Sequence, residues 1–209
     1  MRIAVIADIH SNLEALEASV EDAVKYSVQK FICLGDIVGY AADPSACISR
    51  VREIADTVIA GNHDWAVTGK TNYANFNEMA KRAVEWTASE ISFDDSSYLS
   101  SLKLSHYQEN MLYVHASPVQ PESWNYIWDI YDAIYAFERS ESNITFIGHS
   151  HVPVAFSMFD GKVNYQLFPE IEIQQEKRYL INVGSVGQPR DNDPRASYVI
   201  YDIEKGSLL

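Results

Sequence analysis

The stretch RIAVIADIHSN, residues 2 to 12, indicates both the class of the fold and the place where its polar residues begin. Residues 3 to 7 are all apolar and several are β-branched, which is typical of a strand covered on both faces. Such strands are common in α/β folds, where neighbouring layers cover the sheet. Asp8 and His10 follow directly, so we expect the chain to leave the sheet at these residues.

Helices and strands alternate over the first half of the chain. SNLE at 11 to 14 matches a capping box, with Ser11 as the N-cap and Glu14 as the third helical residue. Asp43 is expected to cap a second helix, with Pro44 in its first turn. The predicted order is strand 2–8, helix from 11, strand 31–36, helix from 43, strand 57–62 and helix 76–91.

The second half of the chain is richer in short strands. One helix is expected around residues 128–139, and Asp160-Gly161 is a turn signal between two strand-like segments. The predicted strands are LKLSHYQ, MLYVHAS, ITFIGHS, VAFSMF, KVNYQLF, YLINVGS and SYVIYDI. We therefore predict mixed sheets, parallel early in the chain and antiparallel late, in a single domain over residues 1–209.

Composition argues against several classes of function. The formal net charge is -13 and there is no basic run, so bulk binding of DNA or RNA is not expected. The apolar stretch before Asp8 has only five residues, too few for a signal sequence or a membrane span. We expect a cytoplasmic protein without a membrane partner. Cys33 and Cys47 lie outside any CxxC pattern, so buried reduced thiols are expected.

Potential metal ligands stand at the ends of five predicted strands. Carboxyl ends of strands form the ligand-binding edge of α/β sheets, so these residues are expected to meet there. Residues two apart on an extended segment share a face, as do His149 and His151. The full set is Asp8, His10, Asp36, Asn62, His63, Asp64, His115, His149 and His151. Gly35, Gly61 and Gly148 flank it and are expected to leave room for an ion.

The donor types indicate the chemistry. Seven of these residues, all but His63 and Asp64, are candidate ligands, too many for one tetrahedral ion. Carboxylate, imidazole and amide donors suit two divalent ions of Mn, Fe, Zn or Ni that share a bridging carboxylate. Such a pair can clamp a phosphate ester and bring the pKa of a bound water toward about 7. His63 could then protonate the leaving oxygen, and Asp64 could orient the His63 ring.

This sequence resembles the calcineurin-like metallophosphoesterase family in DIH at 8–10, GDIVG at 35–39, GNHD at 61–64, His115 and GHSH at 148–151. The resemblance implies a four-layer α/β/β/α sandwich with two mixed sheets. It implies one metal on Asp8, His10, Asp36 and His151, and another on Asp36, Asn62, His115 and His149. It also implies hydrolysis of a small phosphodiester or phosphomonoester, nucleotides among them. The attack would be in line, by a metal-bound hydroxide, with His63 as the general acid.

The segment after Asp36 differs from two branches of that family. Ser/Thr protein phosphatases and symmetrical diadenosine-tetraphosphate hydrolases continue there with an arginine that binds phosphate, whereas this chain has Gly39 and Tyr40. Both activities therefore stay as alternatives only. The chain is more similar to the small bacterial and archaeal phosphodiesterase-like members, also in the C-terminal segment NVGSVGQPRDNDPRASYVIYD.

Two other classes of protein remain as alternatives. A retromer subunit resembles these enzymes but lacks the catalytic histidine, so a non-catalytic scaffold is one alternative, which the presence of His63 disfavours. Metallo-β-lactamase-like hydrolases are another, but they carry an HxHxDH motif that this chain lacks.

Substrate-binding residues are less clearly marked. Arg190, in a Gly/Pro/Asp-rich loop with Arg195, either grips a phosphate oxygen or belongs to a salt-bridged turn. Asn12 is a second candidate. The segment PESWNYIWD, with Trp124 and Trp128, either packs in the core or forms a wall for a nucleobase or aryl group.

Overall fold

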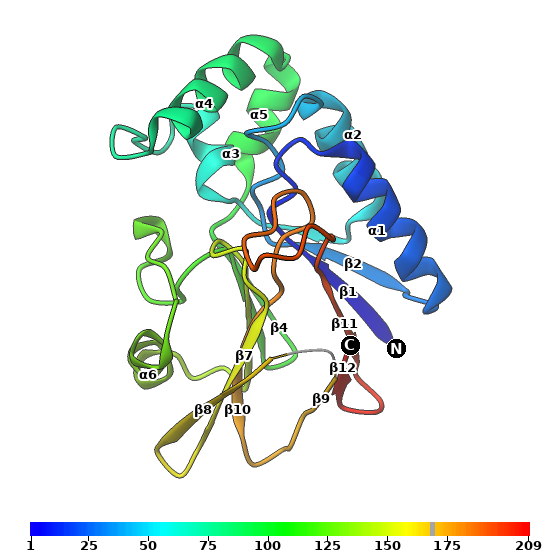
Figure 1. Cartoon of the computed structure of the whole chain (residues 1–209), viewed down its shortest axis with the longest axis vertical. Coiled ribbons are helices and arrows are strands. Elements are labelled where there is room, and N and C mark those ends of the chain that lie inside the picture. Colours follow the sequence, from blue (N-terminus) through cyan, green and yellow to red (C-terminus); the bar gives the residue numbers. More distant parts are fainter. Residues whose placement is uncertain (168–169) are drawn as a thin grey trace.

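Two six-stranded sheets face each other in the computed structural model, which describes residues 1–167 and 170–209 (Figure 1). The strands are β1 (Arg2–Ile6), β2 (Lys30–Cys33), β3 (Thr57–Val58), β4 (Ser105–Gln108), β5 (Met111–Val114), β6 (Ile144–Ile147), β7 (Val154–Phe159), β8 (Lys162–Gln166), β9 (Ile171–Glu172), β10 (Arg178–Asn182), β11 (Val199–Asp202) and β12 (Ser207–Leu208). The helices are α1 (Leu13–Lys25), α2 (Pro44–Ile54), α3 (Asn62–Val67), α4 (Glu78–Glu90), α5 (Phe93–Ser101), α6 (Ile130–Arg139) and the 3-10 helix η1 (Pro121–Ser123). The sheet orders are β3-β2-β1-β11-β12-β9 and β4-β5-β6-β10-β7-β8.

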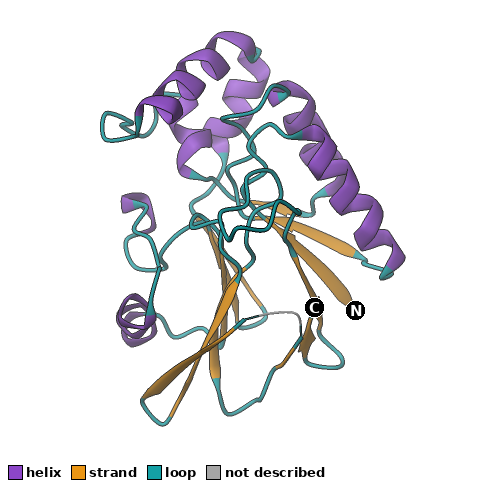
Figure 2. Cartoon of the chain, viewed as in Figure 1, coloured by secondary structure: helices purple, strands orange, loops and turns teal. Residues whose placement is uncertain are grey.

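Helices cover the outer faces of both sheets, so the molecule has four layers (Figure 2). Alternate residues of a strand serve opposite faces. In β1, Ile3 and Val5 pack against the second sheet, whereas Ile6 packs under α1 and α2. In β6, Phe146 faces the first sheet and Ile147 packs with α6. The predicted α/β/β/α sandwich with two mixed sheets is confirmed.

Parallel strands form one side of the first sheet and the middle of the second. β1, β2 and β3 are parallel neighbours in one sheet, and β5, β6 and β10 in the other. The expected change from parallel to antiparallel therefore holds only in part, because α6 crosses over between β5 and β6 and keeps them parallel. The polar segments that follow β1, β2, β5 and β6 converge at one end of the molecule.

The start of α1 differs from the prediction, and the helices α3 and α5 were not predicted. Asn12 caps α1 in place of Ser11, because the Asn12 Oδ1 accepts a hydrogen bond from the N–H of Ala15 at 3.1 Å. The Ser11 hydroxyl instead accepts from the N–H of Gly39. The sequence analysis missed α5, whose Ser- and Asp-rich segment is typical of a loop. Its capping box, Ser92 with Asp95, is the signal that could have marked it.

Three smaller expectations can be compared with the structure. The third strand is short, with only two residues in β3. Cys33 and Cys47 are buried and unpaired, as expected. The segment KVNYQLF contains β8, and its residue 168 lies outside the described residues. No described helix has both the length and the apolar character of a membrane span.

Candidate metal centre

Buried carboxylates and imidazoles from four strand ends and the start of α3 meet in one place. Their possible ligand atoms form three groups, each within 4.8 Å: Asp8, His10 and His151; Asp36, His115 and His149; and His10, Asp36 and His63. All of these side chains are buried. The structure therefore brings together the residues that the sequence placed at separate strand ends, and Asn62 joins them through its Oδ1, 3.1 Å from the His115 Nε2.

Asp8 carries the clearest sign of a cation site. Its Oδ1 is buried and has no hydrogen-bond donor within the described residues. The Nε2 atom of His151 lies 3.3 Å from this oxygen, and those of His10 and His115 each lie 3.9 Å from it. Burial opposes ionisation of Asp8, but the imidazoles of His151 and His115 together outweigh it and lower the pKa to about 2. A buried anionic oxygen without a donor suits a bound cation.

Each ligand histidine is fixed by the main chain on its outer side. The outer ring N–H donates to a backbone carbonyl in four cases: His10 to Val38 at 3.1 Å, His115 to Leu34 at 2.9 Å, His149 to Trp124 at 3.0 Å and His151 to Gln188 at 2.5 Å. Their inner nitrogens face one another, 3.2 Å apart in the pair His10–His151 and in the pair His115–His149. Ring nitrogens held inward in this way are the usual metal donors.

The protonation states also suit a metal. Burial lowers the pKa of His10, and burial together with the charge of His115 lowers that of His149 to about 3. Neutral imidazole and ionised carboxylate are the forms that bind metal. His115 differs: burial lowers its pKa, but the carboxylates of Asp36 and Asp8 together outweigh burial and raise the pKa to about 9. A cation at this point would therefore compete with a proton on His115.

Asp36 lies between the two histidine pairs. Its Oδ2 is 3.7 Å from the His10 Nε2 and 3.4 Å from the His115 Nε2. Its Oδ1 accepts a hydrogen bond from the N–H of His63 at 2.8 Å. Although burial opposes ionisation, the charges of His115 and His63 hold the pKa of Asp36 well below its usual value. This is the position that a bridging carboxylate requires.

The backbone of the site is unusual. Five of the seven candidate ligands have positive φ: Asp8 at 54°, His10 at 50°, Asp36 at 51°, His149 at 68° and His151 at 60°. The glycines make room for these residues. A Cβ at Gly61 would lie 2.1 Å from the Asp36 Oδ1, and one at Gly148 would lie 2.6 Å from the Asp8 Oδ2. Glycine at these two positions therefore allows the carboxylates to approach closely, and the expected room for an ion stays a prediction.

His63 is packed by rings and not by a carboxylate. Its ring centroid is 4.9 Å from those of His10 and Tyr40 and 5.1 Å from that of Phe76. Its Nδ1 has no hydrogen-bond partner within the described residues. The prediction that Asp64 orients this ring is wrong. The Asp64 carboxylate accepts from the N–H groups of Ile37, Val38 and Gly61 instead, because it belongs to the first turn of α3 and folds back onto the preceding loops.

Comparison with known proteins identifies the family. The sequence model of the calcineurin-like phosphoesterase superfamily domain matches residues 1–206. The chain belongs to this family. An uncharacterised protein from Methanocaldococcus jannaschii is 40% identical over 206 residues, which are 96% of this chain and 82% of the relative. The crystal structure of a metallophosphoesterase from Sphaerobacter thermophilus has a TM-score of 0.85 at 36% identity, covering 100% of this chain and 86% of that one. A hypothetical protein from Pyrococcus horikoshii shares the fold, with a TM-score of 0.76 at 17% identity and coverage of 100% and 86%.

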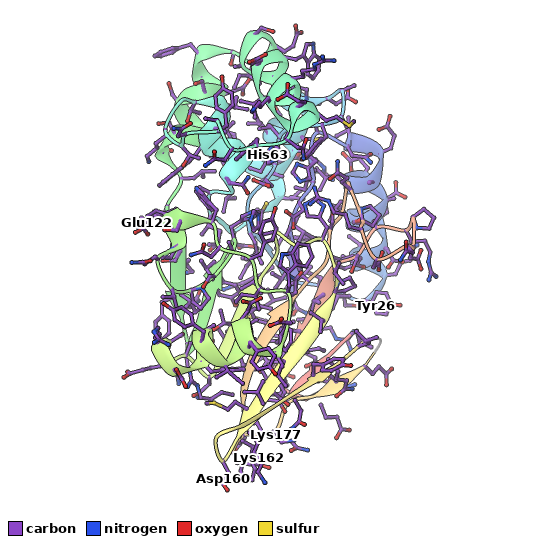
Figure 3. The ribbon with its side chains drawn as sticks, turned by 60° about the vertical axis from the view of Figure 1, so that its left-hand side comes forward. Tyr26, His63, Glu122, Asp160, Lys162 and Lys177 are labelled. Carbon is purple, nitrogen blue, oxygen red and sulfur yellow. The ribbon has the colours of Figure 1, made fainter. Side chains whose placement is uncertain are left out.

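A pocket of about 480 Å³ opens beside the candidate metal ligands. Its lining residues are Tyr40, Asn62, His63, Asn72, Asn75, Phe76, Asn77, Ala80, Ser123, Trp124, Tyr126 and His149. Figure 3 shows His63 just below the helices that follow the third strand. The aromatic segment 121–129 therefore serves the site: Tyr126 stacks on His149 with centroids 3.9 Å apart, and Trp128 stacks on Tyr126 and is 54% exposed. No sequence pattern marks Tyr40, Phe76 or the asparagines as pocket residues.

The predicted substrate-binding residues have different surroundings. Arg190 lies near the site, because its backbone N–H donates to the His151 carbonyl at 3.2 Å. Burial raises the pKa of Tyr126, and the Arg190 guanidinium opposes that shift, so the two groups are close. Arg195 instead pairs with Asp193 in a turn. The Asn12 side chain accepts a hydrogen bond from the N–H of Ala15 in α1 and donates one to the Gly187 carbonyl, both at 3.1 Å. Its observed contacts are therefore structural.

Proposed function

We propose that this protein is a dinuclear metal-dependent phosphoesterase that hydrolyses a small phosphate ester. The observation that carries the proposal is the buried Asp8 Oδ1, which has no donor within the described residues and is surrounded by three imidazole nitrogens. One ion would be held by Asp8, His10, Asp36 and His151, and the second by Asp36, Asn62, His115 and His149. The nitrogen and oxygen donors suit Mn, Fe, Zn or Ni.

Bound divalent ions would supply charge for the phosphate oxygens and lower the pKa of water toward about 7. The protein's own part is to position the ester and to move a proton. His63 would donate a proton to the leaving oxygen as the P–O bond breaks. Burial lowers the pKa of His63, and the negative charge of a bound ester would raise it again. Tyr40 and Phe76 would hold the ring in place by packing, in the role that Asp64 does not fill.

The alternatives within the family fit less well. The pocket beside the site contains Tyr40 where protein phosphatases and diadenosine-tetraphosphate hydrolases have an arginine, and none of its lining residues is basic apart from histidine. A peptide phosphate or a polyphosphate chain would find little counter-charge there. Retention of His63 beside the complete ligand set favours an enzyme over a scaffold.

Metal analysis and a panel of esters test the proposal together. We expect two metals per chain after loading with Mn, Fe, Zn or Ni. We also expect hydrolysis of bis(p-nitrophenyl) phosphate or p-nitrophenyl phosphate, which a chelator abolishes and added metal restores. Metal binding without hydrolysis of any ester would favour the scaffold. Hydrolysis that is unaffected by chelator would contradict a metal centre.

A further inference from the structure

The pocket beside the candidate metal centre is uncharged in a strongly acidic protein. None of its lining residues is Asp, Glu, Lys or Arg, although the chain has a net charge of -13. A ligand part that fills this pocket must therefore be uncharged as well, because it would find no counter-ion.

Flat aromatic faces form the wall nearest to His63. The rings of Tyr40 and Phe76 both contact the His63 ring, with centroids 4.9 and 5.1 Å from it. Tyr126 also lines the pocket, and its ring stacks on His149 at 3.9 Å with an interplanar angle of 18°. Stacking on such faces favours a planar ring as the ligand over an aliphatic chain.

Three asparagines form the rim of the pocket: Asn72, Asn75 and Asn77. The Oδ1 atoms of Asn72 and Asn77 accept backbone N–H groups, of Ala74 at 2.8 Å and of Ala80 at 2.9 Å. No hydrogen bond within the described part of the chain uses their amide NH2 groups, and Asn75 makes none with its side chain. Amides donate and accept, which matches the edge of a nucleobase.

We propose that this pocket binds a nucleoside, and that the nucleoside is the leaving group of a nucleotide ester. The inference rests on the proposed phosphoesterase function. His63 borders the pocket, so the alcohol that occupies it is the one whose oxygen His63 can reach. Water supplies the oxygen of the new P–O bond, the bond from phosphorus to the nucleoside oxygen breaks, and that oxygen takes the proton from His63. The products are a free nucleoside and a phosphate or phosphate monoester.

Matched substrates test the recognition of the base. The 5′-(methyl phosphate) esters of adenosine, guanosine and uridine are each compared with the same ester of methyl riboside, which has equal charge and no base. We expect kcat/KM for at least one nucleoside ester to be about 5- to 100-fold higher than for the riboside, the range that stacking of one base provides. We also expect free nucleoside and methyl phosphate as products.

The outcomes separate the two levels of inference. Equal kcat/KM for all four esters would overturn base recognition and leave the phosphoesterase function standing. Nucleoside monophosphate and methanol as products would overturn the placement of the nucleoside as leaving group. Hydrolysis of none of these esters, nor of the nitrophenyl esters, with any of the four metals would reject the function and this inference with it.

A pair of phenylalanine variants assigns the effect to the pocket. Phe76→Ala should reduce the nucleoside-to-riboside ratio of kcat/KM to near one. Phe159→Ala, at the end of β7 and 51% exposed, should leave the ratio unchanged. Phe76 also packs on His63, so its removal should lower kcat/KM for the nucleoside ester and for the riboside ester alike. The ratio of the two values is therefore the readout. An unchanged ratio in Phe76→Ala would contradict the proposed wall.

A second measurement needs neither metal nor turnover. In chelator, saturation-transfer NMR should show contacts from the base protons of adenosine, guanosine or uridine to the protein, and weaker contacts from methyl riboside. Phe76→Ala should remove the base signals. Absence of base signals with the unsubstituted protein would overturn the proposal.

Discussion

The two ends of the sandwich use the same backbone conformation for different purposes. At the far end, the hairpins turn through Glu109-Asn110 and through Asp160-Gly161, all with positive φ, and three of these four residues are of types that tolerate it. Figure 3 shows Asp160 and Lys162 at the opposite end of the molecule from His63. At the site end, the candidate ligands themselves have positive φ, His10 and His149 among them, which is uncommon for a residue other than glycine. The same conformation therefore aims ligands at one end of the molecule and only reverses the chain at the other.

The largest effect is expected for Asp36→Asn, which alters the site end directly. One carboxylate lies between both histidine pairs, so its loss should weaken both metals together, by more than the roughly 10- to 100-fold that outer-shell changes cause. Metal content and esterase activity measure the effect. Full occupancy and full activity in this variant would disprove the bridging role and remove the main contrast between the two ends.

The next largest effect is expected for His63→Ala. If His63 acts as a general acid, the variant should keep its metals and lose about 10²- to 10⁴-fold in kcat. The loss should be smaller for a nitrophenyl ester, whose leaving group needs little protonation, than for an alkyl ester. His106→Ala is the matched control, because His106 packs on Tyr113 away from the ligands and should affect neither rate. Equal losses on both esters would argue against proton donation by His63.

A pair of glycine variants compares the ends by stability. Gly35 and Gly161 both have positive φ, but a Cβ at Gly35 would meet the Gly61 nitrogen at 2.2 Å whereas one at Gly161 meets nothing within 4 Å. Gly161→Ala should lower the free energy of unfolding by about 1 to 2 kcal/mol through backbone strain alone. Gly35→Ala adds overpacking and should cost about 2 to 5 kcal/mol in total. Urea denaturation in chelator measures both, and similar values would mean that the site end is no more constrained.

The smallest effect is expected at the salt bridge between Arg2 and Asp202, which joins β1 to β11 with a separation of 3.0 Å. The hydrogen bond from Arg2 lowers the pKa of Asp202 in the folded protein. A carboxyl with a depressed folded pKa stabilises the fold above its unfolded value, about 3.9, and that contribution is lost as pH falls through the folded pKa. Asp202→Asn should therefore lower the urea midpoint slightly at neutral pH, and the difference from the unsubstituted protein should shrink in acid. A difference that grows in acid would contradict this reading.

Much of the fold follows from local patterns. The apolar run in β1 and the Asp43-Pro44 start of α2 carry strong signals, and both elements lie where those signals predict. α5 was missed because its residues have weak helix propensity and its packing against α3 is a tertiary effect. The register of the strands and the order of the layers depend on which alternate residues of each strand are buried. That choice can be read from the sequence only once the partners of each strand are known.

The candidate site divides in the same way. The convergence of the metal ligands could be predicted, because the carboxyl ends of parallel strands lie at the same edge of a sheet. The partners of individual side chains could not. Asp64 and Asn12 form hydrogen bonds with backbone groups of other loops. The positions of those groups depend on the dihedral angles of the loops, which cannot be read from the spacing of residues in the sequence. Phe76 lies in an irregular segment before α4, where neither helical nor strand periodicity marks a face.

The main-chain carbonyls that hold the ligand histidines have a consequence for how such a protein can evolve. Trp124 contributes its carbonyl to His149 and its side chain to the pocket. Replacement of that side chain changes the pocket but leaves the carbonyl in the chain, and the same holds for Val38, Leu34 and Gln188. Single substitutions can therefore alter the range of accepted esters while the ligand histidines keep their tautomers. This makes the scaffold a favourable starting point for new specificities.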